Sequence, residues 1–421
     1  MSLVNPHLKS FPHRRRVLNG YKIPFNNYKN IPEGLYWDFI GENGFIGHQS
    51  FLYKAYRPTV REGFKEGSSE LETSPTESWT GIREGGSQKA SMDTAIVSKP
   101  RAFSISLLKP NTKDNVPISI LTSREINVSA YIISECTTPV FCNADANELL
   151  YIQKGRGEIH TEFGVLEYAP FTYVYIPKGT FYRIYGVSPS LILVMEIYKQ
   201  IYLPNFGLLS QDYPIAESLL EGSNLPELRY EINNPPEGKV SVLKKVGTVY
   251  KEEIYTNSPL ACLGWQGTLY PFRIGVKDIN IVESHTFHVP PSAYVTFLNE
   301  DISVNIITFL PRFVHTPPYN HRNTSYNEFM FYSKGVFVSR SGVGEGDITV
   351  HPIGAHHGPQ PKREFFEVKD IEEFKQHFVD EIAIMIESKS NFCMTPASEE
   401  LEIKDYALSW HRESIPDREG E

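Results

Sequence analysis

Two stretches in the last third of the chain decide the fold: residues 321–335 read HRNTSYNEFMFYSKG, and residues 346–357 read GDITVHPIGAHH. In the first, six residues separate Glu328 from Gly335; the second has the form G-x5-P-x-G-x2-H and ends at His357. Glycine tolerates backbone angles that are closed to other residues, so it suits sharp turns at strand ends. Alternate side chains of a strand share one face. The spacing therefore predicts a small β-barrel whose neighbouring strands bring polar side chains to one interior site.

The two stretches place two histidines and one carboxylate where they can meet: His321, Glu328 and His357. Such a set on one side of a metal, with the other positions open, is the ligand arrangement of non-haem Fe(II) oxygenases. The combined spacing is typical of cupin barrels, and we predict that these three residues bind the metal. The alternative is that the histidines are ordinary core or surface residues of a metal-free barrel. Five further histidines in the same region favour metal chemistry: His285, His288, His315, His351 and His356.

An internal repeat links this region to an earlier part of the chain. Residues 148–155, ELLYIQKG, have the same Glu-x6-Gly spacing as residues 328–335, EFMFYSKG. Each copy is followed by strand-like sequence and then by a P-x-G turn, at 177–179 and at 352–354. Two copies of one barrel unit are the simplest explanation.

The first copy is an internal control for the metal site. It keeps Glu148, but the segment that leads to it, FCNADANE, has no histidine. Tyr182 stands at the position of the second ligand histidine. We predict that this barrel binds no metal and supports packing or assembly, and that Glu148 is a structural carboxylate.

Short segments rich in Val, Ile, Tyr and Phe recur between turn residues, a pattern that favours antiparallel sheets. The segments are 118–121, 130–133, 149–152, 173–176 and 191–198. We predict a mostly β fold with two cupin-like jelly-roll or double-stranded β-barrel units, a bicupin-like arrangement, and few helices. The best helical window is 371–388, where apolar residues keep a helical spacing.

The length of 421 residues predicts two or three structural units. We expect an N-terminal β-rich domain over 1–278 that contains the degenerate, metal-free barrel at about 100–200. The stretch 61–95 is rich in Gly, Ser, Thr and Glu, and it is expected to be a flexible surface insertion. A C-terminal cupin domain over 279–421 would then carry the metal site.

Composition narrows the class of protein. Hydrophobic residues are 40% and charged residues 22%, as in a globular protein with a sizeable core. The net charge of −9 argues against a general electrostatic footprint for nucleic acid. Four scattered cysteines make no disulfide scaffold and suggest a reducing compartment. The first residues read as no signal peptide, and no apolar run is long enough for a membrane span. We therefore expect a cytoplasmic protein without membrane or nucleic-acid partners.

The chain resembles the homogentisate 1,2-dioxygenase family, in a branch of bacterial type. The stretch PPYNHRN at 317–323 is similar to the family's Pro-Pro-Tyr-x-His-Arg-Asn signature, and HHGP at 356–359 to its His-Gly-Pro ligand loop. Further resemblances are LPRFVHTPPY at 310–319, HVPPS at 288–292 and, more weakly, LYWDFIGENGFIG and ESKSNF. The resemblance covers most of the chain.

The resemblance implies an Fe(II) cofactor on the three ligands, O2 and homogentisate as partners, and maleylacetoacetate as product, in tyrosine and phenylalanine breakdown. His288 matches the family's catalytic base. The residues expected to contact or support the substrate are His357, Tyr319, Asn323, Phe337 and His351, the last lying behind the ligands. A trimer or a dimer of trimers is also implied.

Two departures from the family pattern bear on the substrate. Glu328 lies seven residues after His321, where the better-known pattern has six, and Phe337 stands where the family can carry a substrate-contacting Tyr. The loss of that hydroxyl leaves open a related hydroxylated aromatic acid, such as a gentisate-like compound. Two other classes also stay open: a zinc-dependent sugar-phosphate isomerase and a non-catalytic bicupin that binds or stores a ligand.

Overall fold

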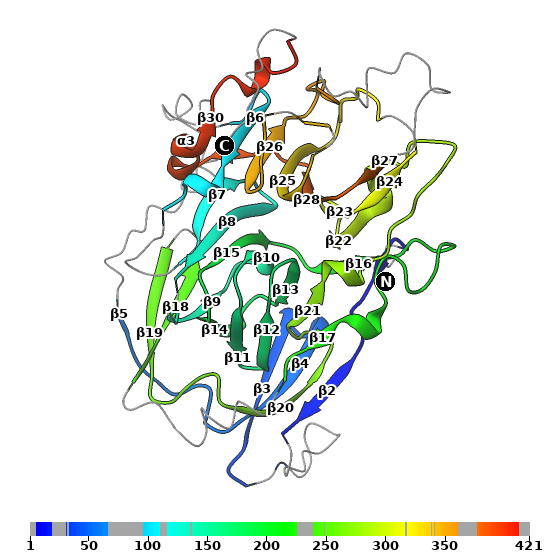
Figure 1. Ribbon diagram of the computed structural model, residues 1–421. Helices are drawn as coiled ribbons and strands as arrows, with labels where there is room; N and C mark the ends of the chain where they lie inside the picture. Colours follow the sequence, from blue (N-terminus) through cyan, green and yellow to red (C-terminus); the bar gives the residue numbers. More distant parts are fainter. Residues whose placement is uncertain are drawn as a thin grey trace, which may run out of the picture.

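The computed structural model describes residues 6–18, 31, 33–65, 96–109, 116–134, 137–224, 239–247, 249–315, 318–337, 339–340, 342–360 and 377–411. Antiparallel strands build almost all of the molecule (Figure 1). Within these ranges there is one α-helix, α3 (Pro396–Leu401), and short 3-10 turns, η2 (Ile105–Leu107), η3 (Glu217–Leu219), η4 (Val276–Asp278), η5 (Pro291–Tyr294) and η8 (Tyr406–Leu408). The predicted mostly β fold with few helices is confirmed. No helix of the described ranges is long and apolar enough to cross a membrane.

The first unit, in the middle and lower part of Figure 1, is a sandwich of two sheets. Its eight-stranded sheet has the order β17 (Glu221–Gly222), β21 (Phe272–Gly275), β13 (Thr172–Ile176), β10 (Asn147–Lys154), β15 (Ser190–Ile197), β8 (Ile126–Ile133), β7 (Ile118–Thr122) and β29 (Cys393–Met394). Its seven-stranded sheet has the order β12 (Gly164–Tyr168), β11 (Gly157–Thr161), β14 (Phe181–Gly186), β9 (Val140–Asn143), β18 (Val240–Val246), β19 (Val249–Tyr255) and β5 (Arg61–Lys65). The five strand segments expected from the sequence are all strands.

The second unit, in the upper half, is built on a nine-stranded sheet. Its order is β1 (Leu8–Lys9), β16 (Ile201–Pro204), β22 (Val295–Asn299), β23 (Val304–Phe309), β28 (Glu381–Ser388), β25 (Asn327–Gly335), β26 (Asp347–His351), β6 (Arg101–Ser104) and β30 (Glu402–Ile403). A two-stranded sheet pairs β24 (Arg312–Val314) with β27 (His377–Val379). A four-stranded sheet at the base of the molecule has the order β2 (Arg14–Val17), β20 (Cys262–Gly267), β4 (Ile46–Lys54) and β3 (Tyr36–Asn43).

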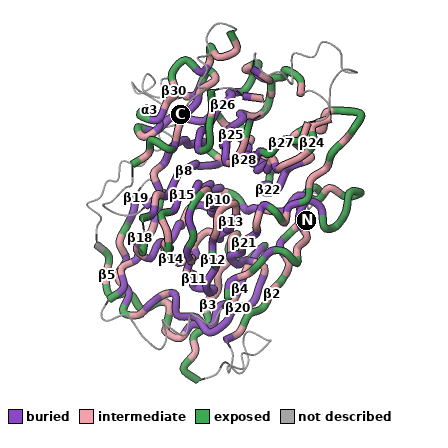
Figure 2. Tube along the Cα trace, viewed as in Figure 1, coloured by how far each residue is buried: buried purple, intermediate pink, exposed green. Residues whose placement is uncertain are grey.

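The strands at the centre of the molecule are buried on both faces (Figure 2). In β10, Leu150 faces the interior of the first barrel, while Tyr151 faces the second unit and its hydroxyl lies 2.6 Å from Ser333 Oγ on β25. In β25, Phe329 joins the core shared by the two units, and Met330 faces the opposite way. Burial of both faces explains the unbroken apolar runs, because neither face needs polar side chains.

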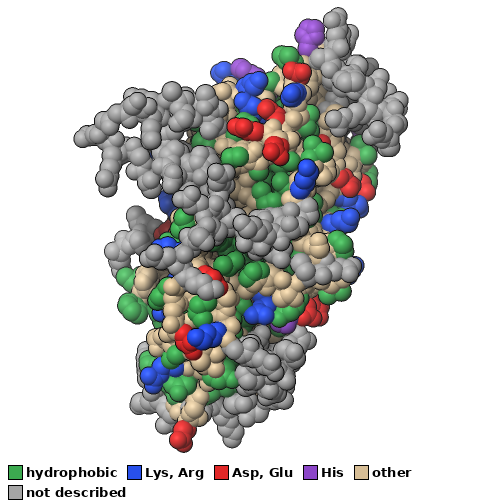
Figure 3. Space-filling view, turned by 90° about the vertical axis from the view of Figure 1, so that its left-hand side faces the viewer, with side chains coloured by type: hydrophobic (Ala, Val, Ile, Leu, Met, Phe, Trp, Pro, Cys, Tyr) green, Lys and Arg blue, Asp and Glu red, His purple; other side chains and the backbone are tan. Residues whose placement is uncertain are grey.

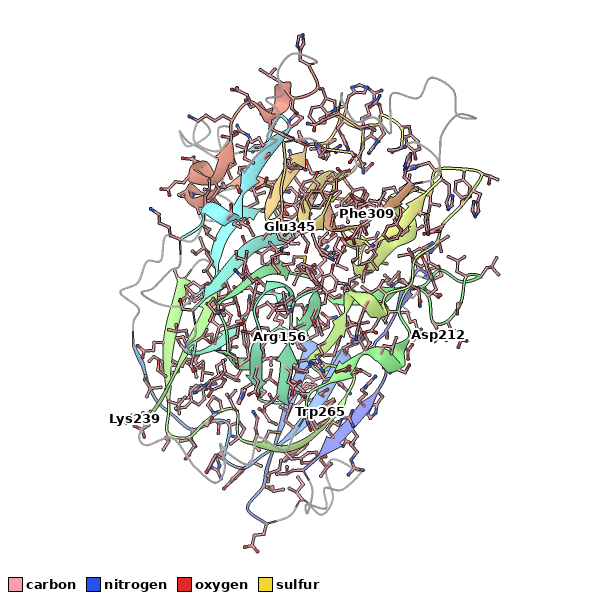
Figure 4. The ribbon with its side chains drawn as sticks, viewed as in Figure 1. Arg156, Asp212, Lys239, Trp265, Phe309 and Glu345 are labelled. Carbon is pink, nitrogen blue, oxygen red and sulfur yellow. The ribbon has the colours of Figure 1, made fainter. Side chains whose placement is uncertain are left out.

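Gly155 and Gly335 close the two Glu-x6-Gly segments in the same backbone conformation, with φ of 94° and 95°. A Cβ atom at Gly335 would lie 1.6 Å from the Asp380 carbonyl oxygen. The backbone N–H of Gly335 donates to Glu345 Oε1 at 3.0 Å, and Glu345 is labelled in Figure 4. Both the positive φ and the close neighbour require glycine here, as the spacing predicted.

The prediction of a helix over 371–388 is wrong. Residues 377–388 form β27 and β28, and residues 371–376 lie outside the described ranges. In β28 the side chains of Ile382, Ile384 and Ile386 enter the shared core, while Met385 packs on the other side. A strand that is apolar on both faces contains residues at helical spacing by chance, and periodicity alone cannot separate the two.

The expectation of a flexible insertion over 61–95 is wrong for its first five residues, because Arg61–Lys65 is a strand paired with β19. Residues 66–95 lie outside the described ranges. The division of the chain at 278–279 stays a prediction. Three strands that precede it, β1, β6 and β16, pair into the nine-stranded sheet of the second unit, so that sheet needs both parts of the chain.

Candidate metal centre and pocket

Two loops and one strand bring the three predicted ligands together. Glu328 is the second residue of β25, and an isolated bridge joins His321 to His357 through hydrogen bonds of 2.8 and 2.9 Å in both directions. One ligand atom from each side chain lies within 4.8 Å of the others. Glu328 Oε2 is 3.2 Å from His357 Nε2 and 3.9 Å from His321 Nε2. Donors about 2.1 Å from a metal and at right angles lie about 3 Å apart, so the set fits one ion.

Backbone carbonyls fix both ligand imidazoles. His321 Nδ1 lies 3.2 Å from the Tyr319 carbonyl oxygen, and His357 Nδ1 lies 2.9 Å from that of Ala355. A carbonyl oxygen only accepts, so each Nδ1 carries a proton, and each Nε2 is the nitrogen that faces Glu328. Without a proton on Nε2, each ring presents its lone pair beside Glu328, as metal ligation requires.

His351 and Tyr406 support the carboxylate from behind. His351 Nδ1 lies 3.0 Å from Glu328 Oε1, and His351 Nε2 lies 3.1 Å from the Tyr406 hydroxyl. The His351 ring stacks on that of His357, with centroids 4.3 Å apart. Burial lowers the pKa of His351 to about 4, so the ring is neutral at pH 7. A neutral His351 donates from Nδ1 to Glu328 and accepts from Tyr406.

The electrostatics keep the carboxylate ionised. Burial acts to raise the pKa of Glu328, but hydrogen bonds from His321, His351 and His357 hold that pKa well below its ordinary value. The hydrogen bond to Glu328 raises the pKa of His321. A buried, ionised carboxylate beside the Nε2 atoms of two histidines is a site prepared for a cation.

One pocket opens onto this group. His321 and Glu328 form part of its wall, and His288 and Tyr319 lie on it with ring centroids 5.2 Å apart, edge to face. Met330 and Tyr332, both from β25, add to the wall. Phe309, labelled in Figure 4, lines it from β23 of the second unit. The pocket thus joins an apolar wall, suited to an aromatic ring, to two of the candidate ligands, His321 and Glu328, and to His288.

Comparison with known proteins now identifies the family. A model of the homogentisate 1,2-dioxygenase N-terminal domain matches residues 29–276, and a model of the C-terminal domain of the same enzyme matches residues 282–415. The chain belongs to the homogentisate 1,2-dioxygenase family. It is therefore an oxidoreductase of the dioxygenase class, and the family resemblance seen in the sequence is confirmed.

Relatives support the family and leave the substrate open. A protein of Saccharolobus solfataricus, described as a dioxygenase without a named substrate, is 31% identical over 390 residues, which are 89% of this chain and 92% of the relative. Homogentisate 1,2-dioxygenases of Pseudomonas fluorescens and Pseudomonas putida are 29% and 27% identical. Each of these matches covers 56% of this chain and 56% of the relative, so the matched part spans about half of those enzymes.

Solved structures are more distant. A cupin 2 conserved barrel protein of Leptotrichia buccalis is 12% identical, with a TM-score of 0.30 over 70% of this chain and 96% of that one. An oxalate decarboxylase of Lactobacillus farciminis is 12% identical, with a TM-score of 0.31 over 70% of this chain and 86% of that one. Scores this low carry no argument about function.

The pocket wall does not include all the residues predicted to contact or support a substrate. His357 is buried and is not among the residues that line the pocket. Phe337 is buried edge to face against Tyr332, with centroids 4.7 Å apart, and it is not among the residues that line the pocket. His351 is likewise buried behind the ligands. Asn323 lies outside the wall: its side chain donates to Glu387 at 3.1 Å and accepts from the N–H groups of Ser325 and Tyr326.

Asn323 belongs to a polar network that occurs once in each barrel. In the second, Glu387 accepts from Asn305 and Asn323 at 2.9 and 3.1 Å. In the first, Glu196 accepts from Asn127 and Asn143, and Asn143 also accepts from two N–H groups that follow it. Glu196 lies opposite Glu148 on β10, as Glu387 lies opposite Glu328 on β25. The repeat thus reproduces a structural network, which accounts for Asn323 without a substrate.

The same correspondence shows what replaces the ligands in the first barrel. Phe141 and Tyr182 are paired on β9 and β14, as His321 and His357 are bridged in the second barrel. The Tyr182 hydroxyl donates to Glu148 at 3.3 Å. Lys245 supplies a cation 2.5 Å from Glu196. Among the described residues, the one group of three or more metal-ligating side chains is in the second barrel.

Sequence reasoning missed several residues of the pocket and its surroundings. Arg312 lines it and pairs with Glu381 at 2.6 Å, and Arg340 lines it next to Gly358. Tyr406 supports His351 from a 3-10 turn far along the chain. Arg312 stands apart from other charged residues and Glu381 follows Asp380 in no recognised motif, so no spacing pattern could have selected them.

Proposed function

We propose that this chain is a homogentisate 1,2-dioxygenase: it would add both atoms of O2 to homogentisate and open the ring to give maleylacetoacetate. The observation that carries the proposal is the meeting of His321, Glu328 and His357 beside one pocket, whose wall includes His321, Glu328 and His288. The family supplies the reaction class. This membership also sets aside the zinc isomerase and the non-catalytic bicupin.

The donor set suits Fe(II). His321 and His357 offer neutral nitrogen atoms and Glu328 one anionic oxygen, all from one side, which is the set associated with non-haem Fe(II) oxygenases. When bound, Fe(II) would supply the redox chemistry that makes O2 reactive towards the ring. One carboxylate leaves the site with a net positive charge, which favours an anionic phenolate.

The protein groups would bind the ring and control its proton. His288 would hold or accept a phenol proton, which makes the ring electron-rich. Tyr319, edge-on to His288, would limit the positions that this imidazole can take. Met330 and Tyr332 would pack against the ring and exclude water from it.

A gentisate-like acid is the second candidate. The observation that favours it is Phe337, which lacks a hydroxyl and is buried against Tyr332 rather than exposed on the pocket wall. The hydroxyl that the family can carry at this position is therefore absent here.

The setting of the enzyme is part of the proposal. We expect it to act in the cytoplasm, in tyrosine and phenylalanine breakdown, as a trimer or a dimer of trimers. Cys142, Cys262 and Cys393 are buried and free, which agrees with a reducing compartment. On the described part of the face in Figure 3, Lys and Arg side chains are interspersed with Asp and Glu, so this face offers no broad basic surface to a nucleic acid.

A substrate panel tests the proposal. The protein is loaded with Fe(II) without air, and O2 uptake is followed with homogentisate, gentisate and 3-hydroxyanthranilate. We expect the highest kcat/KM with homogentisate, together with an ultraviolet-absorbing ring-opened product. Preference for gentisate would move the assignment to the second candidate, and no uptake with any of the three by iron-loaded protein would overturn ring cleavage.

A further inference from the structure

A cleft lies where the four-stranded sheet meets the seven-stranded sheet of the first unit. Residues of β3 and β4 line one side of it, and residues of β5, β9, β14, β18 and β19 line the other. Its volume is about 460 Å³. Cavities of about 300–1,000 Å³ are typical of sites for small organic ligands. The cleft shares no lining residue with the pocket at the candidate metal centre, so it is a separate cavity.

The wall of this cleft is strongly basic, although the chain as a whole carries a net charge of −9. Among the described residues, the one carboxylate on the wall is that of Asp38. The positive side chains on the wall are Lys54, Arg57, Arg61, Lys178 and Lys244. A concave surface lined by one sign of charge concentrates ions of the opposite sign.

Buried carboxylates behind the wall match part of this charge. Lys54 pairs with Glu162, and both side chains are almost fully buried. Glu253 lies 3.2 Å from Arg61 and 3.3 Å from Lys244. One carboxylate therefore serves two cations, and an excess of positive charge remains even among these paired residues.

Two further cations of the wall make no ion pair with a carboxylate of the described residues: Arg57 and Lys178. The Arg57 guanidinium lies over the Tyr36 ring at 5.6 Å, a contact that orients the charge without neutralising it. Burial raises the pKa of Glu42 to about 7, and the charge of Lys178 opposes that shift from beyond ion-pair distance. Glu42 is about half protonated at pH 7, so it is only a partial counter-charge for Lys178.

The two cations approach the cleft from different parts of the fold and are open to solvent. Arg57 follows β4 and is exposed, whereas Lys178 is half-buried in the P-x-G turn between β13 and β14. Apolar groups complete the wall, among them Phe39 and the rings of Phe181 and Tyr255, which meet edge to face with centroids 5.8 Å apart. The cleft thus offers charge and apolar surface to one ligand.

We propose that this cleft binds a small organic anion whose head carries two negative charges, held between Arg57 and Lys178. A phosphate ester and a dicarboxylate share this chemistry. Guanidinium and ammonium groups form strong, charge-assisted hydrogen bonds with such heads. The site is independent of the metal centre and of the ring cleavage proposed for it, because no residue belongs to both cavities.

Binding of inorganic phosphate and of malonate to the iron-loaded protein tests the proposal. Isothermal titration calorimetry at pH 8, where both probes are doubly charged, should show saturable binding of one anion per chain. Arg57→Met and Lys178→Met should each weaken binding by roughly 10-fold, the lower end for hydrogen bonds to charged groups, since neither side chain is fully buried. Arg57→Lys keeps the charge and should retain part of the affinity.

Arg156→Met is the matched control. Arg156 is an exposed cation in the turn between β10 and β11 of the same barrel, labelled in Figure 4, and it does not line the cleft. Its replacement should leave the dissociation constants unchanged. Urea unfolding checks that each variant folds, and should Lys178→Met not fold, the comparison of Arg57→Met with Arg156→Met decides.

The two probes separate the possible ligands. Saturable binding of phosphate alone would support a phosphate ester, binding of malonate alone a dicarboxylate, and mutual displacement a site that accepts both heads. Equal affinities in Arg57→Met and the unaltered protein would place the anion elsewhere, for example at the iron, and would overturn the proposal. The absence of saturable binding of both probes would overturn it as well. Ring cleavage is tested separately by O2 uptake.

Discussion

At the scale of single residues, the ligand site depends on groups that do not touch the metal position. His351 links Glu328 to Tyr406 and stacks on His357, and it is neutral because burial lowers its pKa to about 4. Partners of this kind orient the ligands, and their removal typically weakens metal binding by about 10- to 100-fold. The centre is therefore better described as five residues than as three.

The first prediction concerns this support. His351→Phe keeps an aromatic ring but removes both hydrogen bonds, so Fe(II) affinity should fall by roughly 10- to 100-fold. Competition with a coloured chelator measures the change. Tyr406→Phe removes one hydroxyl further away and should have a smaller effect. Unchanged affinity in His351→Phe would show that Glu328 is held well enough without it.

A second prediction concerns Glu148. Burial, and then the nearby charge of Glu196, raises the pKa of Glu148 from 4.5 to about 8. The folded state therefore binds this proton more tightly than the unfolded state, and stability due to this group falls as pH rises from about 4.5 to 8. Glu148→Gln should be the more stable protein at pH 8, by roughly 2–4 kcal/mol, and should lose that advantage near pH 5.

Urea unfolding at pH 5, 6.5 and 8 checks this prediction. Glu167→Gln, at an exposed carboxylate on β12, is the control and should leave the pH dependence unchanged. A difference between Glu148→Gln and the unaltered protein that stays constant over this range would contradict the assignment of a protonated, structural carboxylate.

The sequence predicted the three ligands because their spacing is set by the strands and turns of a barrel. It could not separate Asn323 from substrate-binding residues, because the network with Glu387 joins residues 64 positions apart. Arg340 also gave no signal, since an isolated arginine fits no motif. Residues fixed by local geometry could be predicted, whereas those chosen by long-range contacts could not.

At the scale of elements, the turn that ends β25 gives the third prediction. Gly335→Ala places a Cβ 1.6 Å from the Asp380 carbonyl oxygen at a φ of 95°, so it should cost about 3 kcal/mol or more of folding free energy. Gly342→Ala is the matched control. Gly342 has a φ of 74° with nothing within 4 Å, so only the backbone penalty of about 1 kcal/mol applies. Equal losses measured by urea unfolding would contradict the steric explanation.

The strand β28 shows where pattern reading failed. Its side chains point alternately into the shared core and towards the pocket, and from Ile382 to Ile386 both sets are apolar. The sequence therefore lacked the polar alternation by which a half-exposed strand is recognised. The strands of the first barrel could be predicted because Gly, Pro and Asn residues separate their short apolar segments.

At the scale of the whole molecule, one core unites the two barrels. It contains Leu149 and Tyr151 from the first unit and Phe329 and Ile384 from the second, all fully buried. A core that spans both units should make them unfold together, although the sequence reads as two repeats. The two copies of the repeat could be predicted from the sequence. The packing of one copy against the other could not, because no local sequence pattern specifies contacts between the two sheets.

The fourth prediction tests this coupling. Phe329→Ala empties a fully buried site in the shared core and should cost about 3–5 kcal/mol. Calorimetry should show one transition that moves to lower temperature as a whole. Two separate transitions, with the first barrel unaffected, would show that the barrels are energetically independent.

The most direct test of the account is the stoichiometry of iron and of O2. Protein loaded with Fe(II) and freed of excess metal should hold one iron per chain and consume one O2 for each homogentisate cleaved. Glu328→Ala and His357→Ala should lose both the iron and the uptake while keeping their β structure. Undiminished O2 consumption by either variant, or turnover of homogentisate without bound iron, would contradict the assignment of His321, Glu328 and His357 as the catalytic metal centre.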